Sequence, residues 1–477
     1  MTSPAVMTVH GPVVGTLDEG INCFLGIPYA DAARFAVARS PKPWDQPLQA
    51  TRFGPGPAQF PMPWLPKNLD LSEDCLTLNV WTPRDAPEAT LPVLVWIFGG
   101  GFEGGLSGTD MFAGHALARA GEVVVVTINY RVGALGFASL KSLGGPYGEA
   151  SNLGLTDVVL ALKWVRANIG SFGGDPGLVT VAGGSAGGFL AGALPATPSA
   201  DGLYQRLALF SGGASRLIPA DRADEIGASI AGHVAGGNLI DAPLSELFEA
   251  QRRVIATDIG ARNGVRPQAF GVVLDDGDAN GVLKMHPLDA YRTPAAQEID
   301  VWAAANADEI SLFRTFDPNF DPVTEDELIG HRNEWGVDHE TATAIVSPYT
   351  QESASMGEVR ERLLTDWIYR LPAARLVEAH TAGGGRGYLS LIGRADGKPA
   401  AHGCETSGIF GRQPENETGP ERHRAAEITR AVIDFVRTGN PGWHSGVDEA
   451  RTFGDSGINA GETYRSILSR WAGVARP

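Results

Sequence analysis

The chain has 477 residues, of which 43% are hydrophobic and 19% are charged, and this composition excludes an intrinsically disordered protein. Its 38 Lys and Arg residues stand against 55 Asp and Glu residues, so the net charge is −17 at pH 7. Without a run of basic residues the sequence lacks the positive surface that phosphate backbones require, and we expect no nucleic-acid partner.

The N-terminal region predicts short strands and a proline-rich loop. Apolar runs at residues 6–9, 13–17 and 21–25 alternate with turn signals, which is typical of a small antiparallel β-meander. The proline-rich stretch at 55–66 is expected to be a surface loop.

From residue 76 onward the pattern predicts an α/β protein with a mostly parallel central sheet. Nearly continuous apolar runs, as in strands buried on both faces, occur at 76–81, 93–98, 123–129, 178–182 and 207–210. Between them, residues 155–169 follow the 3.6-residue period of a helix. Alternating strands and helices imply parallel strands joined by crossovers.

The second half is mainly helical. Helices are predicted at 222–235, 244–255, 325–330, 358–370, 373–380 and 421–437, and strands at 301–305 and 388–392. No change in composition marks a linker, so we expect one domain over residues 1–477, with a helical excursion at about 212–380.

The sequence also gives expectations about location. The first 15 residues lack a basic segment followed by an apolar one, so no signal peptide is expected. The uncharged stretch 176–200 is too rich in Gly and Pro for a membrane helix, so no membrane insertion is expected. The cysteines are too few and scattered for a disulfide framework, which favours the cytoplasm: Cys23, Cys75 and Cys404.

A strand-turn-helix motif carries the first candidate catalytic residue. The strand at 178–182 runs into Gly183, Gly184, Ser185, Ala186 and Gly187, ahead of a helix-compatible stretch. This G-x-S-x-G pattern exposes a serine hydroxyl at the carboxyl edge of a sheet. Its outer glycines leave no room for side chains, and the helix N-terminus favours a developing negative charge. The alternative is an ordinary glycine-rich turn.

A second glycine motif follows the strand at 93–98. Three consecutive glycines, Gly99, Gly100 and Gly101, leave backbone N–H groups unshielded, as an oxyanion hole requires. A nucleotide P-loop is disfavoured because no Gly-Lys-Ser or Gly-Lys-Thr sequence follows. Together the two motifs indicate nucleophilic catalysis by a serine.

A serine nucleophile needs a histidine base and an acid that orients it, in the chain order Ser, acid, His. Of the 10 His residues, His10 and His115 precede the serine and are excluded. The others remain candidates, and His402 is favoured because it lies in a glycine-containing loop after the strand at 388–392. For the acid, Asp308 and Glu309 both follow the strand at 301–305, and spacing does not choose between them.

The chain resembles the type B carboxylesterases, the group that contains bacterial para-nitrobenzyl esterases, animal carboxylesterases and cholinesterases. The resemblance covers nearly the whole length and rests, besides the serine motif, on residues 24–30, 72–80, 129–131, 168–169, 172–176 and 438–441. It implies the α/β-hydrolase fold, a helical excursion over the active site, and neither a metal nor an organic cofactor.

By position in the family's motifs, the resemblance implies three catalytic residues, Ser185, Glu309 and His402. It assigns the acid because residues 306–313 are similar to the family's acid-bearing stretch. The implied oxyanion donors are the backbone N–H groups of Gly100, Gly101 and Ala186. Outside the site it implies two structural ion pairs, Arg34 with Glu73 and Arg131 with Asp175.

The chain departs from the family pattern at three positions. Phe98 stands where most members have His, Gly184 replaces the usual Glu, and Ile310 replaces the usual Gly. Loss of the Glu argues against cationic choline esters, although Trp64 lies near the family's choline-stacking aromatic residue. Cys75 lacks the partner of the family's first disulfide and is expected to be a free, buried thiol. Residues expected to line an apolar pocket, with core packing as the alternative, are Phe102, Trp64, Leu312 and Phe313.

The function that the resemblance implies is a serine carboxylic-ester hydrolase that acts on small to medium, mostly uncharged esters through an acyl-enzyme. One alternative is a hydrolase of carbamates, lactones or amides with the same triad, and another is a lipase with a lid among the inserted helices. An alternative of a different class is a neuroligin-like binding protein, against which the retained triad argues. The expected partner is a small-molecule ester, and the sequence leaves the oligomeric state open.

Overall fold

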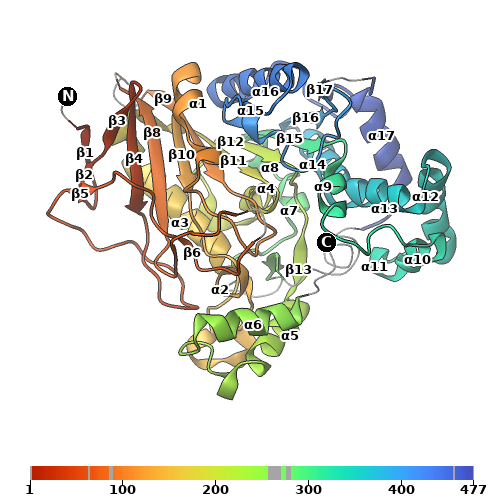
Figure 1. The fold of residues 1–477 in the computed structure, drawn as a ribbon, viewed down its shortest axis with the longest axis horizontal. Helices are drawn as coiled ribbons and strands as arrows, with labels where there is room; N and C mark the ends of the chain where they lie inside the picture. Colours follow the sequence, from red (N-terminus) through yellow and green to blue (C-terminus); the bar gives the residue numbers. More distant parts are fainter. Residues whose placement is uncertain are drawn as a thin grey trace.

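A large mixed sheet with helices on both faces forms the centre of the molecule (Figure 1). The structure is a computed structural model that describes residues 3–62, 65–84, 90–255, 270–275, 281–454 and 457–475. Within these residues the sheet has ten strands, in the order β17 (Arg451–Phe453), β16 (Arg386–Ile392), β15 (Asp300–Asn306), β12 (Arg206–Phe210), β11 (Gly174–Gly184), β9 (Leu91–Ile97), β10 (Val124–Ile128), β8 (Thr77–Pro83), β4 (Ile21–Pro28) and β3 (Thr16–Asp18).

Most neighbouring strands in this sheet are parallel. From β17 through β16, β15, β12, β11 and β9 to β10 every pair is parallel, whereas β8, β4 and β3 continue the sheet in antiparallel pairs. The predicted α/β class with a mostly parallel central sheet is therefore confirmed.

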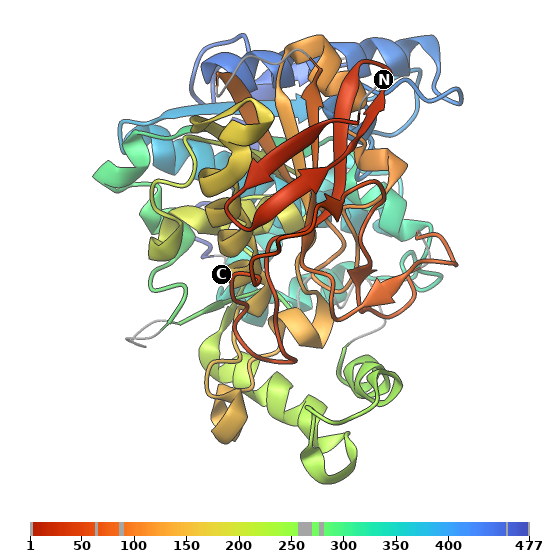
Figure 2. The same ribbon diagram turned by 90° about the vertical axis from the view of Figure 1, so that its left-hand side faces the viewer.

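The N-terminal strands divide between two sheets. β1 (Ala5–Thr8) and β2 (Gly11–Val14) pair as an antiparallel hairpin and form a small sheet with β5 (Leu48–Gln49), while β3 and β4 join the large sheet. The chain crosses between the sheets at Gly15, where a Cβ atom would lie 2.3 Å from the carbonyl oxygen of Cys23. Figure 2 shows these strands nearest the viewer, at the edge of the molecule.

Part of the predicted surface loop at 55–66 is buried instead. β6 (Gly56–Pro57) pairs with β7 (Leu71–Ser72), and Ala58 and Gln59 are buried beside it. The Gln59 side chain both donates to and accepts from the backbone of Gly105, at 2.9 and 2.7 Å. Because its amide is fully paired, this polar segment can lie inside the protein.

Side chains of the central strands alternate between two cores. In β9, Val93, Val95 and Ile97 face a core that contains α3 (Leu153–Asn168) and α4 (Ala186–Ala193). Leu94 and Trp96 point to the opposite face, toward α1 (His115–Gly121) and α16 (Gly419–Thr438). Burial on both faces explains why these strands read as continuous apolar runs in the sequence.

The remaining helices lie between and beside the strands. They are α2 (Gly133–Phe137), α5 (Ala220–Gly232), α6 (Leu244–Val254), α7 (Pro287–Ala290), α8 (Pro294–Gln297), α9 (Glu309–Arg314), α10 (Glu325–Gly330), α11 (Arg332–Trp335), α12 (His339–Glu352), α13 (Met356–Thr365), α14 (Leu371–Ala382), α15 (Thr406–Ile409) and α17 (Ala460–Arg470). A π-helical turn, Asp366–Arg370, joins α13 to α14. In the described part of the chain, no helix combines the length and the apolar character needed to cross a membrane.

The helical excursion is split by strand β15. Helices α5 and α6 lie at the lower end of the molecule in both views, with a two-stranded sheet of β13 (Leu217–Pro219) and β14 (Val272–Leu274) near them (Figures 1 and 2). Helices α10 to α13 follow β15 and lie at the right in Figure 1. The organisation of residues 1–477 as a single domain stays a prediction.

Candidate active site

The candidate nucleophile lies in a strained turn between β11 and α4. Ser185 has φ +53° and ψ −122°, and its backbone N–H donates to the carbonyl of Phe210 at 2.8 Å. A Cβ atom on Gly183 would lie 2.3 Å from the carbonyl oxygen of Gly187, and one on Gly187 would lie 2.1 Å from that of Ile97. The expected steric need for both glycines is confirmed, and the unusual φ marks a conformation that the surrounding structure must hold in place.

The glycine triplet lies against this turn. A Cβ atom on Gly99 would lie 2.6 Å from the carbonyl oxygen of Gly184 and 2.9 Å from Cβ of Ser185. The loop is held by hydrogen bonds from the N–H groups of Glu103 and Gly104 to the carbonyl of Gly100, at 3.1 and 3.2 Å. The contact between the loop and the serine turn therefore leaves no room for a side chain at Gly99.

Three backbone N–H groups are available at this place. Those of Gly100 and Gly101 donate to no protein acceptor within the described ranges. Ala186 is the first residue of α4, so its N–H is one of the donors that a helix leaves unused. Donors held by rigid backbone and free of protein acceptors are what an oxyanion hole requires.

Glu309 and His402 form a close pair. Oε2 of Glu309 lies 2.6 Å from Nδ1 of His402, and Oε1 accepts from the backbone N–H of Asn306 at 2.8 Å. Glu309 is the first residue of α9 and has no exposed side-chain surface, and 13% of the His402 side chain is exposed. Because Glu309 accepts at Nδ1, the proton of a neutral His402 lies on Nδ1 and the Nε2 lone pair is left for a substrate or nucleophile.

The adjacent acid makes different contacts. Asp308 receives two hydrogen bonds from Arg394, at 2.7 and 2.9 Å, and one from the N–H of Ala400 at 2.9 Å. Burial opposes its charged form, but these partners outweigh burial and hold the pKa of Asp308 below its ordinary value. Of the two candidate acids that the spacing left open, only Glu309 contacts the histidine, and Asp308 fixes the loop that leads to it.

Two aromatic rings surround His402. The ring centres of Phe313 and Tyr369 lie 5.1 and 4.9 Å from that of the imidazole. Burial disfavours the protonated form, but the charge of Glu309 and its hydrogen bond outweigh this, so the pKa of His402 lies above its ordinary value. The ring centre of Tyr369 also lies 6.4 Å from that of Phe189, which is one turn after Ser185 in α4. Tyr369 therefore connects the histidine to the serine-bearing helix.

The strand register explains why these groups lie at one edge of the sheet. Paired residues at the strand ends are Gly184 with Phe210, Phe210 with Ala304, and Asn306 with Ile392. β11, β12, β15 and β16 therefore end at the same edge of the sheet. The serine, the acid and the histidine all follow such ends, where α/β proteins bind their ligands.

A second buried carboxyl lies beside the pair. Nδ2 of Asn306 donates to Oε2 of Glu405 at 2.7 Å and to the carbonyl of Ala401 at 3.0 Å. Burial, followed by the nearby charge of Glu309, raises the pKa of Glu405. Sequence reasoning missed both Asn306 and Glu405. The only signal for them was position, since Asn306 lies three residues before the acid and Glu405 lies three residues after the histidine.

The expected pocket residues have different surroundings. Phe102 is fully buried and packs edge-to-face on Phe137 at 5.1 Å, which is core packing. Phe313 is half-buried beside the imidazole, and Leu312 is half-buried in α9. Trp64 lies outside the described residues.

The three departures from the family pattern are accommodated by packing. Phe98 stacks on Tyr130, with ring centres 4.3 Å apart. A Cβ atom on Gly184 would lie 3.3 Å from Trp96, and Ile310 is fully buried. Two of the three positions therefore carry apolar side chains in the core.

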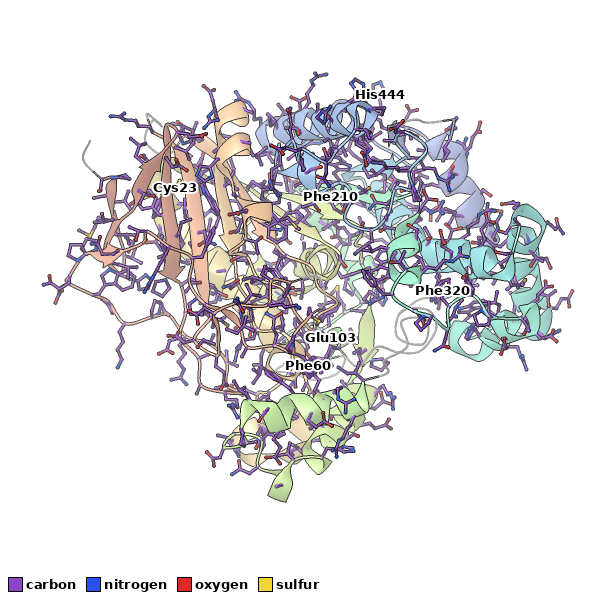
Figure 3. All side chains as sticks on the ribbon, viewed as in Figure 1. Cys23, Phe60, Glu103, Phe210, Phe320 and His444 are labelled. Atoms are coloured by element: carbon purple, nitrogen blue, oxygen red, sulfur yellow. The ribbon has the colours of Figure 1, made fainter. Side chains whose placement is uncertain are left out.

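All three cysteines are free. Cys75 is buried, as expected, and burial raises its pKa. Cys23 lies on β4, far from Phe210 at the serine turn (Figure 3), and burial raises its pKa to about 12. Both thiols are therefore protonated at neutral pH and unreactive.

One of the two expected structural ion pairs is confirmed and the other is corrected. Nη2 of Arg34 lies 2.6 Å from Oε1 of Glu73, as expected. Arg131 pairs at 2.7 Å with Asp157 in α3, whereas Asp175 accepts from the backbone N–H of Gly177. The expected partner of Arg131 was wrong because α3 places the buried carboxylate of Asp157 next to the guanidinium. A buried charge must be paired, so Asp157 is the partner.

The chain is similar to known proteins over most of its length. A family model described as "Carboxylesterase family" matches residues 2–456. The chain is 34% identical to the para-nitrobenzyl esterase of Bacillus subtilis (strain 168) over 473 residues, which cover 92% of this chain and 91% of that protein.

Solved structures show the same likeness. A PNB esterase structure superposes with a TM-score of 0.84 at 30% identity and covers 98% of this chain and 99% of its own. The carboxylesterase of Geobacillus stearothermophilus has a TM-score of 0.79 at 34% identity, with coverage of 92% and 91%. The chain thus has the α/β-hydrolase fold, and it belongs to the carboxylesterase family as a carboxylic-ester hydrolase.

Proposed function

We propose that Ser185, His402 and Glu309 form the catalytic triad of this hydrolase. Nε2 of His402 takes the hydroxyl proton as Oγ of Ser185 attacks the ester carbonyl. The buried Glu309 carboxylate stabilises the imidazolium that forms. The alcohol leaves with the proton from His402, and water then hydrolyses the acyl-enzyme by the same steps.

The oxyanion of each tetrahedral intermediate is proposed to bind three N–H groups, those of Gly100, Gly101 and Ala186. Their support is the closeness of the glycine triplet to the serine turn and the absence of protein acceptors among the described residues. The single observation that carries the proposal is the 2.6 Å contact between Glu309 and Nδ1 of His402, since it fixes the tautomer in which Nε2 is the base.

The proposed substrates are small to medium, mostly uncharged esters, including nitrobenzyl esters of the kind named for the Bacillus relative. The absence of a carboxylate side chain at Gly184 supports neutral over cationic substrates. A series of short esters, long esters, carbamates and anilides compares acyl and leaving groups directly. Highest kcat/KM on carbamates or anilides contradicts the ester preference.

The first prediction is that Ser185→Ala abolishes ester hydrolysis. Loss of such a nucleophile lowers kcat by a factor on the order of 10⁶. The measurement is release of para-nitrophenol from the acetate, butyrate and octanoate esters by wild type and variant. Equal rates for both proteins contradict the role of Ser185.

The second prediction concerns pH. Only neutral His402 accepts a proton, so kcat/KM rises with pH through its pKa. Because Glu309 raises that pKa, the midpoint lies above the ordinary value of about 6.5. Rates from Ser185→Ala at each pH give the background of alkaline ester hydrolysis. A flat profile from about pH 5 to 8 contradicts a histidine base.

A cytoplasmic location is also proposed. It is supported by the free state of Cys23, Cys75 and Cys404, which suits a reducing compartment. Expression with a fluorescent tag at the C-terminus tests it, and accumulation outside the cytoplasm contradicts it.

A further inference from the structure

The π-helical turn Asp366–Arg370 lies beside the acid–base pair. It contacts the histidine directly and the segment that leads to the glutamate. Tyr369 packs against the imidazole of His402, with ring centres 4.9 Å apart. The next residue, Arg370, donates from Nη2 to the carbonyl oxygen of Ala307 at 3.2 Å. Ala307 lies two residues before Glu309, in the short connection between β15 and α9. π-turns are rare and are frequently found at functional sites.

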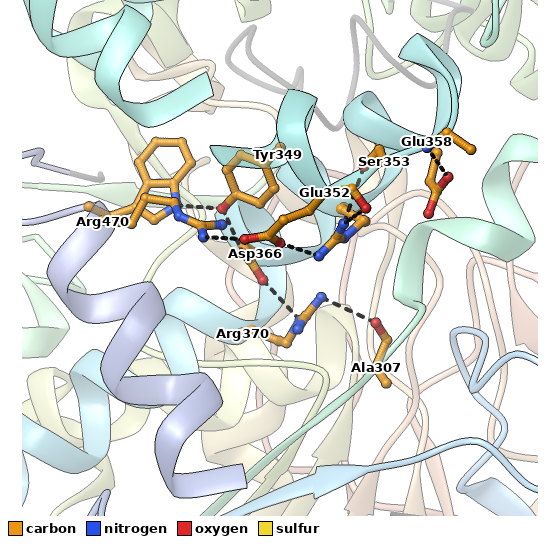
Figure 4. Close-up of polar contacts among 11 residues, drawn as sticks. Ala307, Tyr349, Glu352, Ser353, Glu358, Asp366, Arg370 and Arg470 are labelled. Carbon is orange, nitrogen blue, oxygen red and sulfur yellow. Dashed lines mark hydrogen bonds and ion pairs between the residues drawn. The ribbon is translucent and has the colours of Figure 1, made fainter. Parts of the chain in front are cut away.

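Arg370 is itself held by a buried carboxylate. Its Nε lies 2.9 Å from Oδ1 of Asp366 as an ion pair, although neither atom makes a hydrogen bond to the described residues, and the side-chain exposures are 12% and 4%. Oδ2 of Asp366 accepts from the hydroxyl of Tyr349 at 2.6 Å, and Nε1 of Trp471 donates to that hydroxyl at 3.1 Å. Figure 4 shows Arg370 between Asp366 and Ala307. The Arg370 side chain is therefore mostly buried, with a carboxylate on one side and a backbone carbonyl on the other.

The connection that Arg370 contacts is tied on its other side to β16 and the histidine loop. The N–H of Ala307 donates to the carbonyl of Ile392 at 2.9 Å, and that of Asp308 donates to the carbonyl of Ala400 at 3.0 Å. On the helical side, the N–H of Ile310 donates to Oγ1 of Thr365 at 3.3 Å, just before the π-turn. The acid is therefore held between β16 with the histidine loop on one side and the π-turn on the other.

We propose that Arg370 is a positioning residue for the reaction. By anchoring the carbonyl of Ala307, while Tyr369 packs on His402, it fixes the separation of Glu309 from His402. This inference rests on the proposed triad. An arginine suits the role because its broad guanidinium stays in the ion pair with Asp366 while Nη2 donates to Ala307, a span that the compact ammonium of lysine does not provide.

The test compares Arg370→Met with Arg206→Met. Arg206 is a matched control because it also pairs with a buried aspartate, Asp300 at 3.7 Å, and donates to a backbone carbonyl, that of Val436 at 2.6 Å, at the start of β12 and so at the opposite edge of the sheet. For Arg370→Met we expect kcat to fall about 10- to 100-fold with little change in KM, since a small misplacement of catalytic groups has that effect. The pH midpoint of kcat/KM falls as well, because a looser Glu309 stabilises the imidazolium less. Arg206→Met keeps the wild-type kcat and profile.

A double variant shows whether Arg370 acts through the acid. In a Glu309→Gln background, Arg370→Met is expected to lower kcat by less than about threefold, because residues that act as a unit are not additive. Independent, multiplicative losses overturn the proposal. So does a wild-type profile in Arg370→Met when Glu309→Gln is inactive. Wild-type activity of Glu309→Gln overturns the proposed triad instead.

A second variant separates an effect on catalysis from a failure of Arg370→Met to fold. If Arg370→Met does not fold, Arg370→Lys replaces it, because the ammonium stays with the buried Asp366 and the carbonyl of Ala307 loses its donor. The expected changes have the same direction as for Arg370→Met. A folded Arg370→Lys with wild-type kcat and pH midpoint overturns the proposal.

Discussion

At the scale of single residues, the two neighbouring acids after β15 have separate roles. Asp308 binds Arg394 and the backbone of Ala400, whereas Glu309 contacts His402. Consecutive side chains at the start of a helix point in different directions, so a shift of one position changes the partner completely. Spacing in the sequence therefore left both acids open, and only the resemblance to the carboxylesterases selected Glu309.

Substitutions of the two acids by their amides are expected to affect different properties: activity for Glu309 and stability for Asp308. Glu309→Gln lowers kcat by a factor on the order of 10⁴, because the amide can donate to Nδ1 and favour the wrong tautomer of His402. Asp308→Asn keeps kcat within about threefold and lowers the free energy of unfolding by about 1 kcal/mol, since Arg394 is largely exposed. Esterase kinetics and urea unfolding of both variants measure this. Loss of activity in Asp308→Asn alone contradicts the assignment.

The wrong partner predicted for Arg131 shows a limit of reasoning from relatives. Positions that match a family pair do not fix which carboxylate is nearest in this chain, because that depends on how a helix is rotated. Asp157 lies on α3 among apolar residues. The period of those apolar residues predicts the helix, but it does not show which way the Asp157 side chain points.

At the scale of elements, the serine turn depends on glycine for steric reasons. Gly187→Ala brings a methyl group against the carbonyl of Ile97, 2.1 Å away, which backbone cannot relieve. We expect this variant to be inactive and strongly destabilised or insoluble. Gly232→Ala is the control, since a Cβ atom there meets nothing within 4 Å at the end of α5, and we expect unchanged activity. Soluble expression, kcat and thermal unfolding compare the two, and an active Gly187→Ala contradicts this account.

Elements with strong patterns could be predicted and those with weak ones could not. The central strands were predictable because burial on both faces leaves continuous apolar runs. β17 was not predicted because three residues are too few to show a pattern, and α12 because Pro348 lies inside it. The π-turn was also missed: an extra residue per turn changes hydrogen bonding without changing composition, so residues 358–370 read as one ordinary helix.

At the scale of the whole molecule, the buried pair of Arg131 and Asp157 joins distant segments. Nη1 of Arg131 also donates to the carbonyl of Ala36 at 2.7 Å, so the pair connects the N-terminal region, the end of β10 and α3. Removal of one partner leaves a buried charge without compensation. Such contacts bring together parts of the chain that no local pattern relates.

Asp157→Asn is therefore expected to lower the free energy of unfolding by about 3–5 kcal/mol. The control is Glu225→Gln, which breaks an exposed pair with Arg222 in α5 and changes stability by less than about 0.5 kcal/mol. Midpoints of urea unfolding give both values. Equal midpoints for the two variants contradict a stabilising role for the buried pair.

The placement of the proposed catalytic groups after β11, β15 and β16 also has a consequence for protein synthesis. With the proposed triad, a growing chain that has completed the serine turn holds a nucleophile but no base, because His402 is translated more than two hundred residues later, on the order of tens of seconds at usual rates. Hydrolytic activity therefore begins only when the C-terminal strands have joined the sheet. Chains released early from the ribosome carry the glycine-rich turn without its chemistry, and esters in the cell meet a working enzyme only after nearly all of it has been made.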